Sequence, residues 1–182
     1  MDEAKARWIR ECLERFEGPL LAYASRLLGT RHAAEDAVQE AFLRLCSSER
    51  AAVEPRLPGW LYSVTRNLAL DRRRRERVME RTNAATLEDR PGAGDDPADR
   101  AAAGDEAASA LRALARLPER QQEAIRLRPQ HGLPYREIAE VMDVTVDHVG
   151  VLLHEGLKAL RRRLGVSPPA AAAAPVAREI GR

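Results

Sequence analysis

The stretch from Pro58 to Arg81 most constrains what this chain can fold into, because it predicts one helix of about six turns. Pro58 suits the first turn of a helix, where its missing N–H would have no partner anyway. Successive residues of a helix are about 100° apart, which separates this stretch into three faces. One face is an apolar stripe that has to pack on another element. The stripe consists of Leu61, Val64, Leu68 and Met79. The second face carries Tyr62, Arg66, Arg73 and Arg77, and the third carries Trp60, Asn67, Asp71 and Arg74.

A helix that buries one side and offers aromatic, Arg and Asn side chains on the others is suited to nucleic acid. Guanidinium groups bind phosphates, aromatic rings stack on unpaired bases, and Asn hydrogen-bonds to base edges. The alternative interpretation of this stretch alone is a solvated basic helix end.

The composition favours an all-helical protein. Hydrophobic residues make up 45% of the 182 residues, but aromatic residues only 4%, and β-branched runs are scarce. The net charge of +2 would not by itself suggest nucleic acid, so the clustering of the basic residues matters more than their sum. No apolar run approaches the ~20 residues that span a bilayer, and the N-terminus has no signal-peptide core. We therefore expect a cytoplasmic protein without membrane insertion.

The sequence also argues against an enzyme. Cys12 and Cys46 are isolated, which predicts free thiols in a reducing compartment. His148 and His154 are six residues apart with no carboxylate or thiol array around them, so no metal site is expected. No cluster of His, Cys or carboxylates has catalytic spacing, and no cofactor is expected.

The first part of the chain predicts further helices. Residues 3–17 form the first, Gly18-Pro19 is expected to break it, and Leu20–Leu28 forms another that ends at Gly29. A helix over about His32–Ser47 has the apolar stripe Ala34, Val38, Ala41, Phe42 and Leu45. Its opposite face is acidic and carries Glu35, Asp36, Gln39, Glu40 and Leu43. This face is either stabilised by the helix dipole alone or docks a basic partner.

Changes in composition divide the chain into two small helical domains. Residues 1–82 form the first domain. Residues 83–106 are rich in Gly, Pro, Ala and acidic residues, which predicts a flexible acidic linker. Residues 107–165 form the second helical domain, and the Ala- and Pro-rich tail 166–182 lacks a core.

Tyr135 to His154 reads as a helix-turn-helix, a motif that binds DNA through its second helix. Ala139 is small where the two helices approach, and Asp143 occupies the turn, where it tolerates left-handed geometry. Thr145 can cap the second helix through its hydroxyl. The expected core between the helices consists of Ile138, Met142, Val144 and Val149.

Two patterns in this order resemble the sigma-70 family of bacterial transcription factors. Residues 34–45 (AEDAVQEAFLRL) and 58–71 (PGWLYSVTRNLALD) resemble region 2, and residues 117–124 (LPERQQEA) with 132–142 (GLPYREIAEVM) resemble region 4. The absence of regions 1 and 3 is typical of the extracytoplasmic-function (ECF) group. The resemblance covers roughly residues 10–82 and 107–165.

The resemblance implies a promoter-specificity subunit of RNA polymerase with no catalysis of its own. Its partners would be core RNA polymerase, through the β′ coiled coil and the β flap, and promoter DNA; an anti-sigma factor is a further candidate. The residues implied for core polymerase are Asp36, Gln39, Glu40 and Leu43. Those for the −10 element, where the duplex is melted, are Trp60, Tyr62, Arg66, Asn67, Arg73 and Arg74. Those for the −35 element are Tyr135, Arg136, Thr145, Asp147, His148, Val151, His154 and Lys158.

The second helix of the motif departs from the family. Where the family usually has Lys, Ser and Arg, this chain has Gly150, Val151 and Leu152, and Glu155 stands where the family has Arg. We therefore expect weak sequence readout at the −35 element. The alternatives are a helix-turn-helix regulator that binds an operator without polymerase, or a sigma-like protein with degenerate −35 readout.

Overall fold

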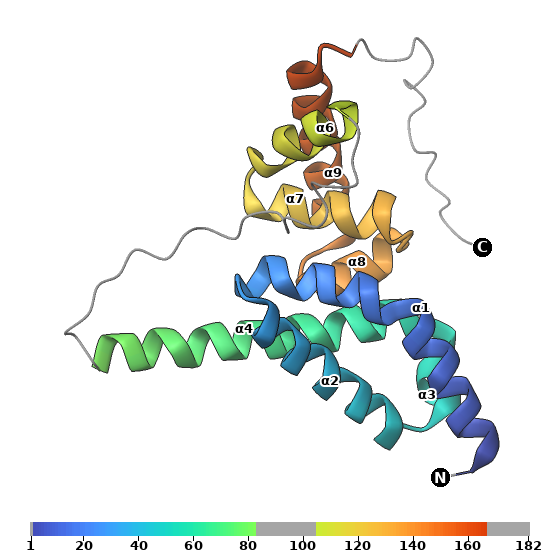
Figure 1. Ribbon diagram of the computed structural model, residues 1–182. Helices are drawn as coiled ribbons and strands as arrows, with labels where there is room; N and C mark the ends of the chain where they lie inside the picture. The colour runs from blue at the N-terminus through green and yellow to red at the C-terminus, as the bar shows by residue number, and fades with distance from the viewer. Residues whose placement is uncertain (1, 83–104, 167–182) are drawn as a thin grey trace.

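The computed structural model describes residues 2–82 and 105–166, and every regular element in these two ranges is helical. The predicted all-α fold of two helical units is confirmed (Figure 1). The first unit contains α1 (Glu3–Leu28), α2 (Arg31–Ser47), α3 (Arg50–Val53), the 3-10 turn η1 (Glu54–Arg56) and α4 (Leu57–Thr82). The second contains α6 (Asp105–Ala115), α7 (Glu119–Ile125), the π-helical turn η2 (Arg126–Gln130), α8 (Tyr135–Met142) and α9 (Val146–Leu164). The predicted linker, up to residue 104, and the tail from residue 167 lie outside the described residues.

Helix α1 is continuous through Pro19, so the expected break at Gly18-Pro19 is wrong. Proline removes one helical hydrogen bond and its ring crowds the preceding turn, which bends a helix without necessarily ending it. Figure 1 shows this bend along α1. Phe16 and Leu20, on either side of Pro19, are both buried, whereas Gly18 and Pro19 face solvent. Burial of side chains on both halves stabilises one helix across the proline.

Helices α1, α2 and α4 pack together around the predicted stripe of α2. All five residues of this stripe are buried, which confirms the prediction for α2. On α4, Leu61 is buried and Val64 and Leu68 are half-buried, but Met79 remains 64% exposed. The last turns of α4 extend beyond α1 and α2 (Figure 1), which is why no other described helix covers the end of α4.

The second unit contains the predicted helix-turn-helix, formed by α8 and α9. Asp143 ends α8 in the left-handed region with φ 54° and ψ 58°, as the sequence predicts. Thr145 caps α9, because its Oγ1 accepts a hydrogen bond from the backbone N–H of His148 at 3.2 Å. Ile138, Met142 and Val149 are buried, which confirms these three members of the expected core, and the fourth, Val144, is half-buried against it.

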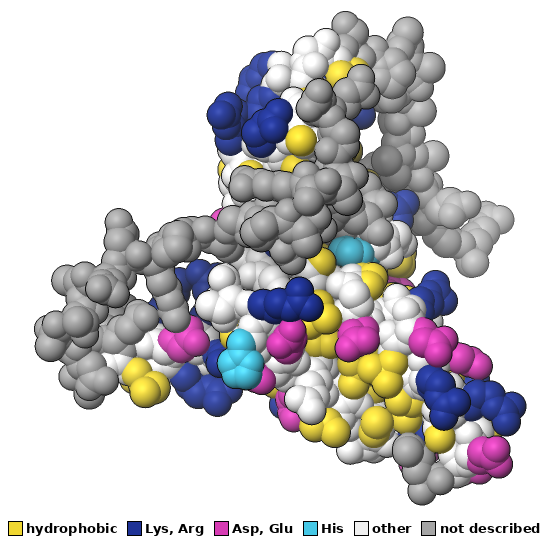
Figure 2. Space-filling view, in the orientation of Figure 1, with side chains coloured by type: hydrophobic (Ala, Val, Ile, Leu, Met, Phe, Trp, Pro, Cys, Tyr) yellow, Lys and Arg dark blue, Asp and Glu magenta, His cyan; other side chains and the backbone are white. Residues whose placement is uncertain are grey.

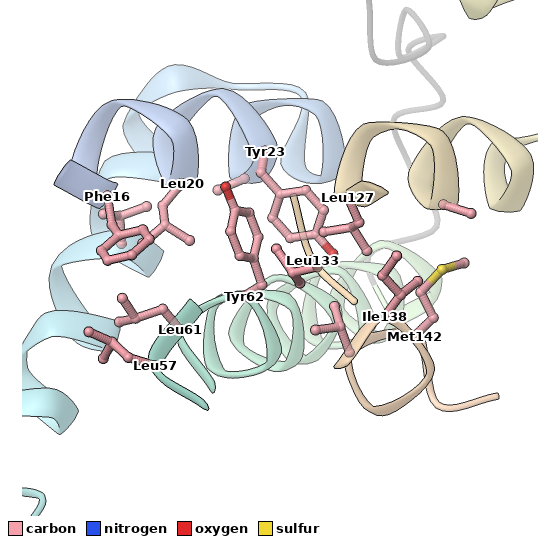
Figure 3. Close-up of a cluster of buried hydrophobic side chains, with 14 of the residues drawn as sticks. Phe16, Leu20, Tyr23, Leu57, Leu61, Tyr62, Leu127, Leu133, Ile138 and Met142 are labelled. Atoms are coloured by element: carbon pink, nitrogen blue, oxygen red, sulfur yellow. The ribbon is translucent and has the colours of Figure 1, made fainter. Parts of the chain in front are cut away.

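The two helical units share one hydrophobic core, which the sequence did not predict. Figure 3 shows side chains of α1 and α4, such as Leu20 and Leu61, continuing into those of the second unit. Leu127, Leu133 and Ile138 of the second unit are 0%, 1% and 0% exposed. Helix α8 lies against the first turns of α4, so the second unit covers the beginning of that helix.

Candidate functional site

The acidic face predicted for α2 lies at the surface. Asp36, Gln39 and Leu43 are exposed and Glu40 is half-buried, as their helical spacing requires. Nη1 of Arg72 donates a hydrogen bond to the Asp36 carboxylate at 2.7 Å, and this bond lowers the pKa of Asp36. The face therefore combines carboxylates with the apolar side chain of Leu43, which is 56% exposed.

A hollow of about 480 Å³ lies between this face and the first turns of α4. Leu43 and Ser47 of α2 line one side, and Trp60 and Val64 of α4 line the other. An open hollow with a Trp and aliphatic walls is typical of a surface that receives a partner's side chains or bases. Trp60, which the sequence placed with the DNA-contacting residues, thus lies beside the residues expected to bind polymerase.

Tyr62 lies in the core and is 1% exposed, so its expected place on an exposed aromatic and basic face is wrong. Its ring meets the ring of Tyr23 in α1 edge-on, with the ring centres 5.2 Å apart (Figure 3). The ring centre of His131 lies 4.8 Å from that of Tyr62. Burial raises the pKa of the Tyr62 hydroxyl, which has no hydrogen-bond partner among the described residues. The 100° spacing correctly grouped Tyr62 with Arg66, but only the packing of the second unit shows that this side is covered.

Arg66 is also engaged between the two units. Its Nε donates a hydrogen bond to Oε1 of Glu123 in α7 at 2.8 Å, and the two side chains are only 14% and 12% exposed. The same oxygen accepts a hydrogen bond from the Tyr23 hydroxyl at 2.6 Å. Burial alone would lower the pKa of Arg66, but the charge of Glu123 and its hydrogen bond raise it overall. Glu123 therefore joins α1 and α4 to the second unit.

The second unit also contacts the N-terminus of α4. Oε2 of Glu137 accepts a hydrogen bond from the backbone N–H of Gly59 at 2.9 Å, which places a carboxylate at the positive end of the helix dipole. Arg56, in the turn before α4, forms a longer ion pair with Glu140 at 3.7 Å. Sequence reasoning missed Glu123, Glu137 and Glu140, because nothing in a local pattern shows which distant helix a carboxylate will meet.

Three of the residues predicted for the −10 element remain accessible on α4. Asn67 and Arg74 are exposed and Arg73 is half-buried. Neither of these two arginines forms an ion pair within ranges 2–82 and 105–166. The middle of α4 therefore offers two cations and an amide to a partner, whereas the side of the helix with Tyr62 and Arg66 does not.

The residues predicted for the −35 element lie on the surface of α8 and α9. Asp147, Val151, His154 and Lys158 are exposed and follow one another along α9 at helical spacing. His148, also on α9, and Arg136, in the first turn of α8, are exposed as well. Tyr135 is 41% exposed, and the guanidinium of Arg128 lies 5.4 Å from its ring centre. Thr145 is exposed and its hydroxyl is used by the cap.

The exposed surface of α9 is less basic than a typical DNA-reading helix. Val146 and Val151 are 46% and 56% exposed, and Asp147 and Glu155 add negative charge. Lysine and arginine occur only in the second half of the helix, from Lys158 onward. The first half of α9 therefore offers apolar contacts, and phosphate contacts would fall to its second half.

The pKa of His131 is strongly lowered from the ordinary histidine value of 6.5. Burial, together with the nearby positive charges of Arg26 and Arg126, lowers the pKa of His131 to about 4. The imidazole is therefore neutral at pH 7 where it contacts Tyr62. This makes the contact between the two units sensitive to acid.

The described part of the chain contains no group of three or more His, Cys, Asp or Glu side chains placed to hold a metal ion. Among the helices described, none combines the length and the hydropathy needed to cross a membrane.

Comparison with known proteins finds two family regions in the chain. Residues 12–78 match Sigma-70 region 2, and residues 107–160 match Sigma-70, region 4. Together the two matches cover more than half of the chain.

Several ECF RNA polymerase sigma factors are similar in sequence. Identity is 33% with SigE of Mycolicibacterium smegmatis, over 78% of this chain and 54% of that protein. It is 33% with EcfG of Rhodopseudomonas palustris, over 70% of this chain and 68% of the relative. It is 30% with SigL of Mycobacterium tuberculosis, over 90% of this chain and 94% of the relative. The chain spans about half the length of the first of these relatives.

The fold is similar to that of the sigma factor RpoE from Bartonella quintana, solved in complex with the anti-sigma factor NepR. The TM-score is 0.61 at 22% identity, over 87% of this chain and 98% of RpoE. Two family regions in their expected order, on a helical fold of this kind, lead to one conclusion: the chain belongs to the sigma-70 family, in its ECF group of sigma factors.

Proposed function

We propose that this protein is a promoter-specificity subunit that binds core RNA polymerase, recognises the −10 and −35 elements and melts the DNA at −10. It carries out no chemical step of its own. The observation that carries the proposal is the presence in one chain of region 2, with an exposed Asn and Arg surface on α4, and of region 4, with an exposed helix-turn-helix.

The surface of α2 is assigned to core polymerase. Asp36, Gln39, Glu40 and Leu43 would contact the β′ coiled coil, with Leu43 as the apolar centre of a polar patch. This arrangement fits a protein interface, in which a few buried apolar side chains supply most of the affinity and a charged rim orients the partner. The second unit would contact the β flap.

The middle of α4 is assigned to the −10 element. Asn67 would contact base edges, and Arg73 and Arg74 would bind phosphates. Trp60, at the edge of the 480 Å³ hollow, is placed to stack on a base taken out of the duplex. Unstacking costs a few kcal/mol per step, which stacking on Trp60 and contacts in the hollow would offset.

The described arrangement is assigned to a closed form, which has to open before both promoter elements are bound. Two turns of B-DNA, the span we assign to the two elements, measure about 70 Å. In the closed form α8 packs directly on the first turns of α4, so the two DNA-binding units are adjacent. Opening would break the Arg66–Glu123 ion pair and expose Tyr62, so both residues would reach DNA only in the open form.

At the −35 element, α9 would read few bases. Val151 and His154 are its exposed candidates for base contact, while Lys158 is placed for phosphate. Footprinting of the Val151→Ala and His154→Ala proteins on a promoter tests this assignment. We expect a small, sequence-independent loss at −35; a large base-specific loss would show that this helix reads sequence after all.

Run-off transcription from a promoter library tests the proposed function itself. Core polymerase is supplied with this protein in one reaction and without it in the other. We expect discrete transcripts from a subset of promoters only when the protein is present. Transcription equal to that of core polymerase alone would refute the proposal, and tight promoter binding without polymerase would favour an operator-binding regulator.

A further inference from the structure

A second hollow, of about 130 Å³, lies where the C-terminal part of α9 passes α6. Its lining includes the side chains of Ser109, Arg112, Arg116 and Arg163. One water molecule needs roughly 10–15 Å³ of such space, so the hollow has room for a polyatomic ion. It is separate from the surfaces assigned above to polymerase and promoter bases.

Helical geometry explains how the three arginines meet. Ser109, Arg112 and Arg116 follow one another along the α6 side with spacings of three and four residues, so they lie on one face. Arg163 lies about 120° around the axis of α9 from Val151. It is therefore on the side of α9 that faces α6, and not among the residues predicted to contact the −35 element. Figure 2 shows Lys and Arg side chains gathered over this end of the molecule.

In the described part of the chain, no carboxylate balances the charges in this hollow. No carboxylate lines it, and among described residues none of its three arginines forms an ion pair. Elsewhere in the described structure Arg31, Arg44 and Arg66 each have a carboxylate within 3.0 Å. Like charges brought together repel, and this repulsion is relieved when an anion lies between them.

Helix capping does not account for the cluster on α6. The carbonyls of Ala115 and Leu117, at the end of α6, already accept hydrogen bonds from the side-chain amide of Gln122 at 3.2 and 2.8 Å. Cations near a helix C-terminus do stabilise its dipole, which accounts for Arg163 in the last turn of α9 and for Arg112 in the last turn of α6. The helix dipoles do not account for Arg116, which follows the end of α6, or for the convergence of all three guanidinium groups on the same hollow.

We propose that this hollow binds a phosphate group. Guanidinium forks match pairs of phosphate oxygens, and three of them with the Ser109 hydroxyl would satisfy a tetrahedral anion from two sides. The phosphate comes either from a DNA backbone or from a small phosphorylated molecule. The inference does not depend on promoter recognition, because the site is defined by residues outside the proposed reading surfaces.

Titrations of the full chain, followed by NMR of the arginine Nε–Hε signals, test the site. One arm uses inorganic pyrophosphate, and the other uses a short DNA duplex of scrambled sequence. We expect the signals of Arg112, Arg116 and Arg163 to shift together and saturate in at least one arm. Arg116→Gln should weaken that binding by about tenfold or more, the effect of losing a charge-assisted hydrogen bond.

Arg161→Gln is the matched control, because it removes the same charge from the last turn of α9 without lining the hollow. Saturation by pyrophosphate would identify a free phosphorylated ligand. Saturation by duplex alone would identify a backbone phosphate, and Arg163→Gln should then reduce the salt slope of duplex binding by about 0.9. Absence of saturable shifts in both arms, or an equal loss in Arg161→Gln and Arg163→Gln, would overturn the proposal. Neither result would affect the transcription experiment above.

Discussion

Arg66 in α4 and Glu123 in α7 form an ion pair of 2.8 Å that joins the two family regions of this sigma factor. The same carboxylate oxygen accepts a hydrogen bond from the hydroxyl of Tyr23, so one acidic side chain binds both α1 and α4 of the first unit. Breaking a nearly buried pair leaves a charge without its partner, which costs more than the pair's net contribution. Substitution of one member of this pair therefore tests the closed form selectively.

Glu123→Ala is expected to weaken the closed form. Loss of the carboxylate removes the acceptor of the hydrogen bonds from Arg66 and Tyr23, and we expect the contact to be about 1–3 kcal/mol less stable. Small-angle X-ray scattering should show a larger radius of gyration than for the unmodified protein. Glu119→Ala, an exposed substitution in the same helix, is the control and should leave the radius unchanged. Equal radii for all three proteins would contradict this role of Glu123.

Gly59→Ala should open the contact between α4 and α8. An added Cβ would lie 2.5 Å from Oε2 and 3.0 Å from Cβ of Glu137, so rotation of the Glu137 side chain alone does not clear it. Because Ala favours a helix over Gly by about 1 kcal/mol, α4 itself should remain helical. Circular dichroism checks the helix, and limited proteolysis checks the opening. Adding Glu137→Ala removes the 2.5 Å contact with Oε2 and leaves the 3.0 Å contact with Cβ, so it should restore part of the protection. Sensitivity in the double variant equal to that of Gly59→Ala would show that the clash is not the cause.

Acid should destabilise the closed form through His131. The folded pKa, about 4, lies below the ordinary value of 6.5, so the stabilisation is complete above pH 6.5 and is lost as pH falls toward 4. The groups facing the imidazole are Tyr62, Arg26 and Arg126, and both arginines oppose its protonation. Urea unfolding should show about 1–2 kcal/mol less stability at pH 5 than at pH 7.5. In His131→Phe this difference should shrink; an unchanged difference would place the acid sensitivity elsewhere.

Leu43→Ala should weaken binding to core polymerase. Removing an exposed apolar side chain that becomes buried in an interface costs about 1–2 kcal/mol, or roughly a tenfold increase in Kd. Met79→Ala is the control, because Met79 is also an exposed apolar residue but lies on the projecting end of α4. Fluorescence anisotropy with labelled protein and core polymerase measures both. If the two variants lost affinity equally, the assignment of α2 to polymerase would fail.

Asn67→Ala and Arg73→Ala should affect promoters differently. Loss of a phosphate contact weakens binding to all promoters alike and reduces the salt slope by about 1, whereas loss of a base contact changes which −10 sequences are used. We therefore expect the first effect for Arg73→Ala and the second for Asn67→Ala. Holoenzyme binding to a −10 sequence library at several salt concentrations separates them. An unchanged sequence preference in Asn67→Ala would place the reading surface on another side of α4.

The sequence by itself determined the local features of this protein. Pro58 marked the start of α4, Asp143 and Thr145 marked the turn and cap between α8 and α9, and the stripe of α2 was identified by its spacing. Each of these depends on backbone geometry or on residues within a few positions of one another. The two family regions were recognisable for the same reason, because their motifs are continuous in the chain.

Only the tertiary structure decided which helix faces stay exposed. Periodicity grouped Tyr62 with Arg66 correctly, but their burial depends on His131 and Glu123, more than fifty residues away. Continuity of α1 through Pro19 likewise depends on burial on both sides of the bend. A helical pattern shows which residues share a face. Whether that face contacts solvent, DNA or another helix depends on long-range contacts, which the local sequence does not encode.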